Sequence, residues 1–424
     1  MSPPLPLILV SAVFPPAPTA GAPRVRAMVR YLPAHGILPT VVATDGAQLP
    51  PGVDGRLALH RVPHREPPPS AKSFRGDRLP WWRRLLRDLA ATPDRYDCWS
   101  RQAARLAWRL ARARRAPVLV SVPPVSAAWH VARLRQPGDP PLFIDFRDAW
   151  LDDPVRADYY RNPLRRWREQ RMEARTLGQA AGCLVVSPSM AEDFRCRYPA
   201  LADRFHLLMN GYDEADWRDL PALAPLPAGS LNLVYTGSFP GYRTPRFVLQ
   251  ALAELNAPDI RFDLIGDSSG KAQRLVRQQW PWLADRVHFH PRASQALALA
   301  WQQAADVLLL IVAPGPRGDE TRMEVTSKVF EYLRSRRPLL ATLPPGGDLD
   351  RLLAPLPWVT RVAATDVPGI QAALRHALAR KKAGTLAGPA GDGLIEAYRR
   401  DRQMSALAQL LIDISMSSGM KQAA

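Results

Sequence analysis

Short apolar runs with strand character alternate with helical segments through the first half of the chain. The runs cover residues 7–10, 40–44, 57–62, 118–122, 142–146 and 183–186. They are near-continuous apolar runs between helices, which is typical of parallel strands covered by helices on both faces. The pattern therefore predicts an α/β unit built on a parallel sheet.

A second series of the same kind follows a proline-rich stretch. Its expected strands are residues 231–236, 261–265, 287–290, 307–312 and 338–341, and its expected helices are 245–256, 270–280, 294–304 and 326–335. Between the two series, residues 212–230 contain three prolines and a glycine, and we expect the interdomain linker there. The expected organisation is an N-terminal domain over 1–211, a C-terminal domain over 231–390, and a closing helix and tail over 391–424.

Length and cysteine content limit the class of protein. A chain of 424 residues is long enough for two or three domains that each bury a core. No apolar run reaches about 18 residues, so no membrane-spanning helix is expected. Residues 1–10 lack a preceding positive charge and lead into Pro15-Pro16, which favours a first strand over a signal peptide. Three widely spaced cysteines fit a reducing cytoplasm and indicate no metal site.

The chain carries a formal charge of +18, almost all of its excess from arginine. Such a charge implies attraction to polyanions or to an anionic membrane surface. Residues 81–115 concentrate this charge, with Trp81 and Trp82 beside Arg83, Arg84 and Arg87, and a stripe at helical spacing formed by Arg101, Arg105, Arg109 and Arg112. The stripe is either a membrane-surface helix or a solvated helix face. No zinc-finger spacing, aromatic RNA-binding motif or basic tail is present, so nucleic acid is not the expected partner.

The segment 324–333 suggests a binding site for a nucleotide-sugar. A polar turn containing Thr326 and Ser327 runs into a helix in which Lys328 and Glu331 share one face. Backbone N–H groups at that helix start, together with Lys328, suit a diphosphate. The carboxylate of Glu331 can accept hydrogen bonds from two sugar hydroxyls. The alternative is an ordinary amphipathic helix with a surface ion pair.

Glycines and arginines follow several of the expected strands. The loop after residues 7–10 contains Gly21 and Arg24, and the loop after 231–236 contains Gly237, Ser238 and Arg243. Gly266 follows the next strand in the second series. A glycine lets a ligand approach the backbone, and an arginine can hold a phosphate through two hydrogen bonds. Simple turns with surface arginines are the alternative.

Three charged residues close the strand at 142–146. Asp145, Arg147 and Asp148 stand where the carboxyl end of a parallel strand faces a ligand crevice. A buried structural Asp–Arg pair is the competing explanation. His130 and His206 have no partner at metal-ligand spacing, and we expect both to be structural.

Taken in order and spacing, these motifs resemble a GT-B glycosyltransferase of the family 4 type, common in bacterial polysaccharide and glycolipid assembly. The resemblance covers nearly the whole chain. It rests on Phe14-Pro15-Pro16 to Gly21-Ala22-Pro23-Arg24, Asp145 to Trp150, Val186 to Met190, Asn210 to Asp213, Tyr235 to Ser238, and Ser327 to Leu333.

The resemblance implies two Rossmann-like domains whose parallel sheets face each other across a cleft holding the active site. It implies that the C-terminal domain binds a nucleotide-diphosphate sugar and that the N-terminal domain receives a glycan or lipid-linked acceptor. The implied reaction transfers one sugar, hexosyl or related, with retention and without a metal or other cofactor. The implied location is the cytoplasm, with peripheral contact at the inner face of the cytoplasmic membrane.

The resemblance also assigns residues to roles. Arg243 and Lys328 match the cationic pair that neutralises the departing diphosphate, and Asp148 joins them as an expected catalytic residue. The expected donor-binding residues are Gly21, Gly237, Ser238, Gly266, Thr326, Ser327 and Glu331, and the expected acceptor-side residues are Arg24 and Arg147.

The chain departs from the family pattern at two places. The family often has two glutamates eight residues apart, whereas Met323 stands at the earlier position and Glu324 comes one residue later. Many members have a histidine after the Pro-Pro pair, and none directly follows Pro123-Pro124 here. Two other functions remain open at this stage, a nucleotide-sugar epimerase on the same fold and a polyanion- or nucleic-acid-binding protein.

Overall fold

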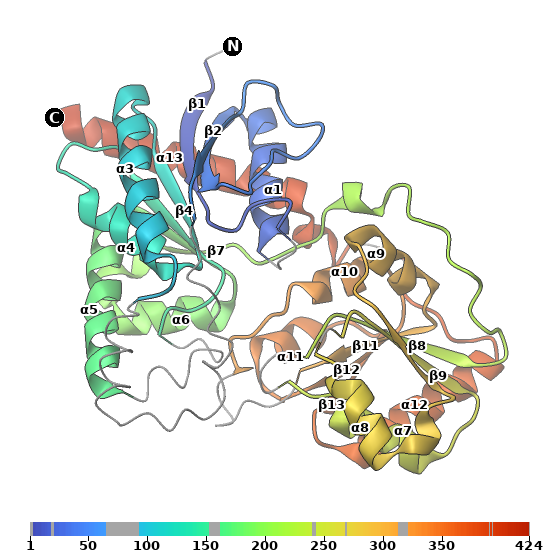
Figure 1. Ribbon diagram of the computed structural model, residues 1–424. Helices are drawn as coiled ribbons and strands as arrows, with labels where there is room; N and C mark the ends of the chain where they lie inside the picture. Colours follow the sequence, from blue (N-terminus) through green and yellow to red (C-terminus); the bar gives the residue numbers. More distant parts are fainter. Residues whose placement is uncertain are drawn as a thin grey trace. The chain divides into compact units, whose positions relative to one another are not determined.

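The computed structural model describes residues 3–17, 21–64, 93–151, 162–239, 243–267, 269–312, 321–389, 391 and 393–423. The chain divides into two compact units, each a parallel sheet with helices packed against it (Figure 1). Unit 1 contains Met1–Asn210 together with Arg400–Ala424, and unit 2 contains Gly211–Arg399. Among the described residues, no helix is long and apolar enough to cross a membrane.

The sheet of unit 1 has seven parallel strands in the order β3-β2-β1-β4-β5-β6-β7. They are β1 (Leu5–Val10), β2 (Ile37–Thr44), β3 (Ala58–Val62), β4 (Val118–Val122), β5 (Leu142–Phe146), β6 (Gly182–Val185) and β7 (Phe205–Leu207). The chain builds outward from β1 to β3 and then returns to place β4 on the other side of β1. The strand order therefore reverses between β1 and β4, where open α/β sheets bind ligands at their carboxyl ends.

Helices cover both faces of this sheet. They are α1 (Ala22–Tyr31), η1 (Leu32–His35), α3 (Asp97–Arg114), α4 (Val125–Leu134), α5 (Pro163–Gln179), α6 (Pro188–Arg197), η3 (Pro199–Arg204) and α13 (Arg400–Ala423). The C-terminal helix α13 packs on α1, and its Met404, Leu407 and Leu411 are buried in the same core as Val25 and Met28. The closing helix expected within 391–424 thus completes the core of unit 1.

The sheet of unit 2 has six parallel strands in the order β10-β9-β8-β11-β12-β13. They are β8 (Leu231–Thr236), β9 (Ile260–Ile265), β10 (Val287–His290), β11 (Val307–Ile311), β12 (Leu339–Leu343) and β13 (Val359–Ala363). The helices are η4 (Glu214–Trp217), α7 (Arg246–Leu255), α8 (Lys271–Gln279), η5 (Pro281–Leu283), α9 (Gln295–Ala304), α10 (Lys328–Arg334), α11 (Asp348–Leu353), α12 (Val367–Lys382) and η7 (Glu396–Tyr398). Here the strand order reverses between β8 and β11.

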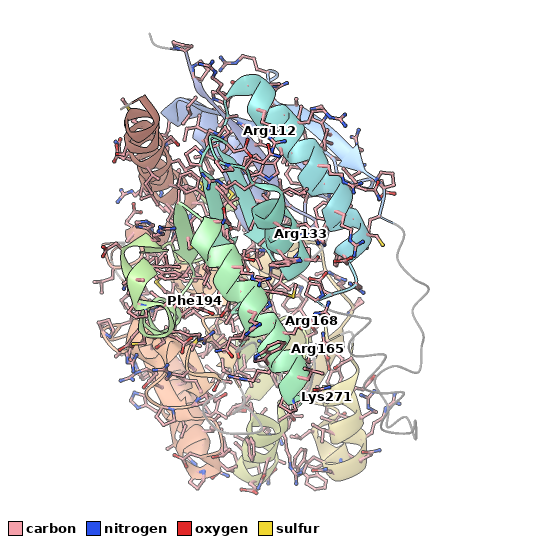
Figure 2. The ribbon with its side chains drawn as sticks, turned by 90° about the vertical axis from the view of Figure 1, so that its left-hand side faces the viewer. Arg112, Arg133, Arg165, Arg168, Phe194 and Lys271 are labelled. Atoms are coloured by element: carbon pink, nitrogen blue, oxygen red, sulfur yellow. The ribbon has the colours of Figure 1, made fainter. Side chains whose placement is uncertain are left out.

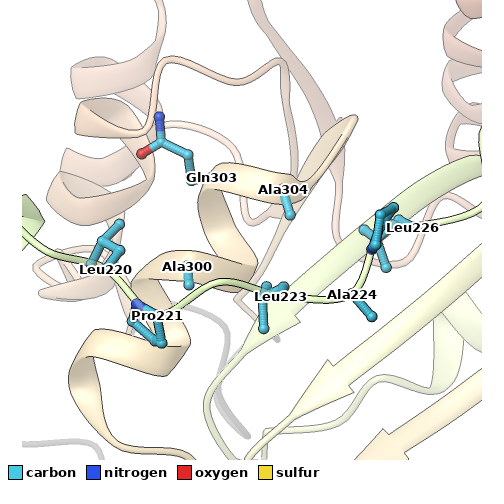
Figure 3. Close-up of a pocket in the computed structure, with 9 residues that line it drawn as sticks. Leu220, Pro221, Leu223, Ala224, Leu226, Ala300, Gln303 and Ala304 are labelled. Atoms are coloured by element: carbon cyan, nitrogen blue, oxygen red, sulfur yellow. The ribbon is translucent and has the colours of Figure 1, made fainter.

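The stretch 212–230, expected to be the interdomain linker, belongs to unit 2. Its first turn, η4, is capped by Asp213, whose Oδ1 accepts from the Ala215 N–H at 3.1 Å. The rest runs along α9, and a pocket of about 240 Å³ lies between them. Figure 3 shows the residues that line it. This pocket is lined by Leu220, Pro221, Leu223, Ala224, Pro225 and Leu226 with Ala300, Gln303 and Ala304 of α9. The proline-rich segment and α9 thus form the two walls of a mainly apolar pocket.

Candidate functional site

Lys328 begins α10, and its side chain lies against the end of β8. Its Nζ donates a hydrogen bond to the Tyr235 hydroxyl at 2.9 Å and lies 4.2 Å from the centre of that ring. The Tyr235 hydroxyl in turn donates to the Ser238 carbonyl at 3.3 Å. Burial removes water from the ammonium group and lowers the pKa of Lys328. The arrangement holds a poorly hydrated cation beside the carboxyl end of a central strand.

Position 237 requires glycine for two reasons, its backbone conformation and the closeness of Lys328. Its φ of 128° lies in a region that side-chain-bearing residues rarely adopt. A Cβ added there would stand 2.5 Å from Lys328 Nζ. The sequence predicts Gly237 as a point of close phosphate approach, and the structure adds that a larger residue would displace the lysine. Gly266, with φ 91°, lies next to Gly237: a Cβ added to Gly266 would stand 3.9 Å from the Gly237 backbone.

Two glutamines hold the carboxylate of Glu331, one turn beyond Lys328. Gln295 Nε2 donates to Glu331 Oε1 and Gln302 Nε2 donates to Glu331 Oε2, each at 3.4 Å. Gln302 is fully buried and also donates to Thr236 Oγ1 at 3.0 Å. Sequence reasoning does not identify these glutamines, although their seven-residue separation on α9 places them on one helix face.

Arg243 completes a charged group in unit 2. Its guanidinium pairs with Glu324, and Lys271 Nζ donates to the Arg243 backbone carbonyl at 2.6 Å. Arg243 contributes to lowering the pKa of Lys328, whereas Glu324 and Glu331 oppose that shift, so all four side chains share one electrostatic environment. The structure thus brings together Arg243 and Lys328, predicted as catalytic residues, and Glu331, predicted as a donor-binding residue. Thr326, just before the helix, has a buried Oγ1 without a hydrogen-bond partner among the described residues.

In unit 1 the charged residues at the end of β5 separate into a buried pair and an outer group. Arg24 Nε lies 3.0 Å from both Asp145 oxygens, and its Nη2 lies 2.6 Å from Oδ1. Ser121 Oγ also donates to Asp145 at 3.2 Å. Asp145 is fully buried and Arg24 is 2% exposed. The buried Asp–Arg pair considered from the sequence is therefore present, with Arg24 of α1 as the partner, and these contacts give Arg24 a structural role. Its acceptor-side role stays a prediction.

Arg147 lies in the outer group with Gly21. Its Nη2 donates to the Pro123 carbonyl at 2.7 Å, and desolvation lowers its pKa while the nearby charge of Asp148 opposes the shift. A Cβ on Gly21 would fall 1.1 Å from Arg147 Nη1, so only glycine leaves room for this guanidinium. Asp148 is exposed. The structure thus places the predicted residues Gly21, Arg147 and Asp148 together in unit 1 and the other predicted site residues, apart from Arg24, in unit 2.

Two histidines, His130 and His290, are hydrogen-bonded to aspartates. His130 Nε2 is 2.7 Å from Asp97 Oδ1, as expected for a structural residue, and desolvation lowers the pKa of His206. His290, at the end of β10, contacts the buried Asp263 at 2.7 Å and lies against Trp301. Within the described part of the chain, no group of three or more His, Cys, Asp or Glu residues is placed to hold a metal ion.

Comparisons with known proteins agree with this architecture. Residues 22–216 match the model of the family described as Glycosyltransferase Family 4. A search of curated proteins gave no match.

Solved structures resemble the chain over both units. Sucrose-phosphate synthase from Thermosynechococcus elongatus is 15% identical with a TM-score of 0.60, over 99% of this chain and 98% of that one. HepE from Anabaena, in complex with UDP and glucose, is 12% identical with a TM-score of 0.57, over 99% of each chain. The lipopolysaccharide outer core galactosyltransferase WaaB is 12% identical with a TM-score of 0.60, over 96% of this chain and 99% of that one. At such identities the likeness establishes the fold, and it confirms the GT-B fold class predicted from the sequence.

Proposed function

We propose a donor, an acceptor class and a mechanism for this chain, which is a GT-B glycosyltransferase of the family 4 type. It moves one sugar from a nucleotide-diphosphate sugar to a glycan or lipid-linked acceptor, with retention at the anomeric carbon and without a metal. The observation that carries the proposal is the group formed by Lys328, Arg243 and Glu331 at the carboxyl end of β8.

The two cations account for stabilisation of the leaving group. Negative charge develops on the diphosphate as the bond to the sugar breaks, and fixed positive groups stabilise that charge most where water is excluded. Lys328 is desolvated and anchored on Tyr235, and Arg243 is anchored through its side chain and its backbone. A preorganised pair of this kind supplies the charge that a divalent cation supplies in other enzymes.

Glu331 is the residue we propose to hold the ribose. The two glutamine amides donate to its carboxylate, and the two oxygens of a carboxylate can accept hydrogen bonds from sugar hydroxyls. In unit 1, Arg147 and Asp148 are the proposed acceptor-side and catalytic groups. UDP and glucose, which the HepE structure contains, support a uridine-diphosphate hexose as the first donor to test here.

Ligand-induced stabilisation is the direct test. A bound nucleotide-sugar raises the melting temperature by mass action, so a panel led by UDP-glucose is expected to contain a stabilising donor. Product analysis then decides the reaction. An epimerase forms a new nucleotide-sugar without acceptor, whereas a transferase needs one, and the anomeric configuration of the product reports retention. Binding of nucleoside diphosphates that weakens steeply with salt would instead favour a polyanion-binding protein.

Replacing Glu331 with alanine is expected to weaken donor binding and leave the fold intact. Losing a charged hydrogen-bond partner costs about 1.5–3 kcal/mol of binding free energy, which a calorimetric titration with donor measures. The matched control is Glu254→Ala, an exposed glutamate on α7 of the same unit. Donor affinity equal to that of the wild type would remove Glu331 from the binding site.

Peripheral binding to an anionic membrane is the second part of the proposal. The helices α3, α4 and α5 pack side by side, and Figure 2 shows Arg112, Arg133 and Arg168 along them. Arg105 and Arg109 on α3 and Arg133 on α4 are exposed. Trp167 on α5 is 51% exposed beside Arg171, which suits a membrane interface. The tryptophans and arginines at 81–87 lie outside the described residues.

We expect the protein to sediment with anionic vesicles at low salt and to dissociate as salt rises. Each arginine near such a surface contributes about 1 kcal/mol, so Arg105→Gln, Arg109→Gln and Arg133→Gln together are expected to weaken binding roughly a hundredfold. A control that removes the same charge from unit 2 is Arg274→Gln, Arg277→Gln and Arg375→Gln. If wild-type protein stays in solution with anionic vesicles at low salt, the basic helices are a solvated face.

A further inference from the structure

The guanidinium of Arg243 is paired with a carboxylate of the same chain. The carboxylate of Glu324 forms an ion pair with it, and the two side chains are only 13% and 28% exposed, for Glu324 and Arg243 respectively. Glu324 therefore acts on the same group that the proposed mechanism directs at the diphosphate. An ion pair that is largely removed from water is screened less than a surface pair and fixes side-chain geometry more strongly.

The backbone near each partner of the ion pair is hydrogen-bonded to another part of unit 2. The Glu324 N–H donates to the Thr321 carbonyl at 3.0 Å, and the preceding Arg322 carbonyl accepts from the Asp348 N–H at 2.8 Å. On the other side, Lys271 at the start of α8 donates to the Arg243 carbonyl at 2.6 Å (Lys271 is labelled in Figure 2). Each partner thus has hydrogen-bonded backbone on its own side of the ion pair, and the ion pair is the contact that orients the Arg243 side chain.

A fixed carboxylate on this arginine has two consequences for a diphosphate. It aims the guanidinium, which is needed for an effective electrostatic contact. It also places a like charge beside any phosphate that the same guanidinium binds, and like charges brought together oppose binding. The first effect assists bond cleavage and the second assists release of the nucleoside diphosphate product.

We propose that Glu324 is a positioning residue that aims Arg243 at the departing diphosphate and, as a competing anion, speeds release of the nucleoside diphosphate. This inference rests on the proposed function. It assigns Glu324 a role through Arg243 and no contact with the reacting atoms.

The test compares Glu324→Gln, which keeps the shape and removes the charge, with Glu324→Asp, which keeps the charge. The probes are UDP and inorganic pyrophosphate, measured by calorimetry, with turnover followed on the best donor. Glu324→Gln is expected to bind the probes about tenfold more tightly, because a negative charge beside the bound phosphate is lost. It is also expected to turn over more slowly, because the Arg243 guanidinium is less well aimed. Glu324→Asp is expected to retain wild-type probe affinity. Glu254→Gln is the surface control.

If Glu324 has only a structural role, Glu324→Gln binds the probes more weakly or does not bind them. Either result overturns the inference, and so does a probe affinity equal to that of the wild type. If the effect acts through Arg243, it disappears when Glu324→Gln is combined with Arg243→Ala. Tighter binding that persists in the double variant also counts against it. Should Glu324→Gln fail to fold, tighter probe binding by Glu324→Asp contradicts the role assigned to the charge. Normal turnover in both Arg243→Ala and Lys328→Ala would instead reject the proposed site itself.

Discussion

Lys328→Ala is expected to lower turnover by about a hundredfold or more and to leave the free energy of unfolding almost unchanged. The loss of turnover follows from removing a desolvated cation from the departing diphosphate. The fold tolerates the change because burial already disfavours the ammonium, which is why its pKa is lowered, and alanine removes that penalty together with the hydrogen bond to Tyr235. Steady-state kinetics measure turnover, and hydrogen exchange of the β8 and β9 amides, which reports unit 2 alone, measures the free energy of unfolding.

The control for this prediction is Lys382→Ala, which removes an exposed lysine paired with Asp259 at the surface of the same unit. Arg243→Ala is expected to act in the same direction as Lys328→Ala. Near-normal turnover in both variants would exclude the two cations from leaving-group stabilisation.

Metal independence is tested separately: a Mg²⁺ chelator is expected to leave wild-type activity intact, and strong inhibition would contradict the proposed mechanism.

The strands of both sheets are predictable where burial on two faces leaves a near-continuous apolar run. Residues 231–236 were predicted as a strand and form β8 with the same bounds. The edge strand β13 was missed, because none of its residues Val359–Ala363 is buried and their pattern carries no apolar run. The helix α13 was expected, but its place in unit 1 was not, since periodicity identifies an apolar face and not the core that receives it.

The candidate site was predictable to the extent that its groups are charged or are glycines at strand ends. Lys328 and Glu331 are close in sequence and on one helix face, so the pattern alone joins them. Glu324 and Arg243 are 81 residues apart, and only the tertiary fold shows that they pair. Gln302 is a neutral side chain, and nothing in the sequence distinguishes a glutamine that orients a carboxylate from one on a helix surface.

The pair formed by Arg24 and Asp145 shows the same limit, because 121 residues separate its members while Arg147 stands two positions from the aspartate. Sequence proximity made Arg147 the natural partner. The structure instead places the α1 arginine beside the end of β5, because β1 leads into α1 and the carboxyl ends of β1, β4 and β5 meet at one edge of the sheet. The charged residues that the sequence places at this edge of the sheet therefore fall into two sets. Arg24 and Asp145 form a buried structural pair, and Arg147 and Asp148 lie with Gly21 in the outer group.

Asp145→Ala is expected to destabilise unit 1 by about 3–5 kcal/mol, because it leaves the buried Arg24 guanidinium without its counter-charge. Arg24→Met together with Asp145→Ala is expected to cost less than the sum of the single changes, since the double variant buries no unpaired charge. Because two units unfold in one chain, the measurement is hydrogen exchange of the β4 and β5 amides, which reports unit 1 alone. Asp148→Ala, the exposed neighbour, is the control and is expected to change protection by less than about 0.5 kcal/mol. Protection in Asp145→Ala equal to that of this control would show that the pair contributes nothing measurable to the stability of unit 1 and would contradict the structural role given to Arg24.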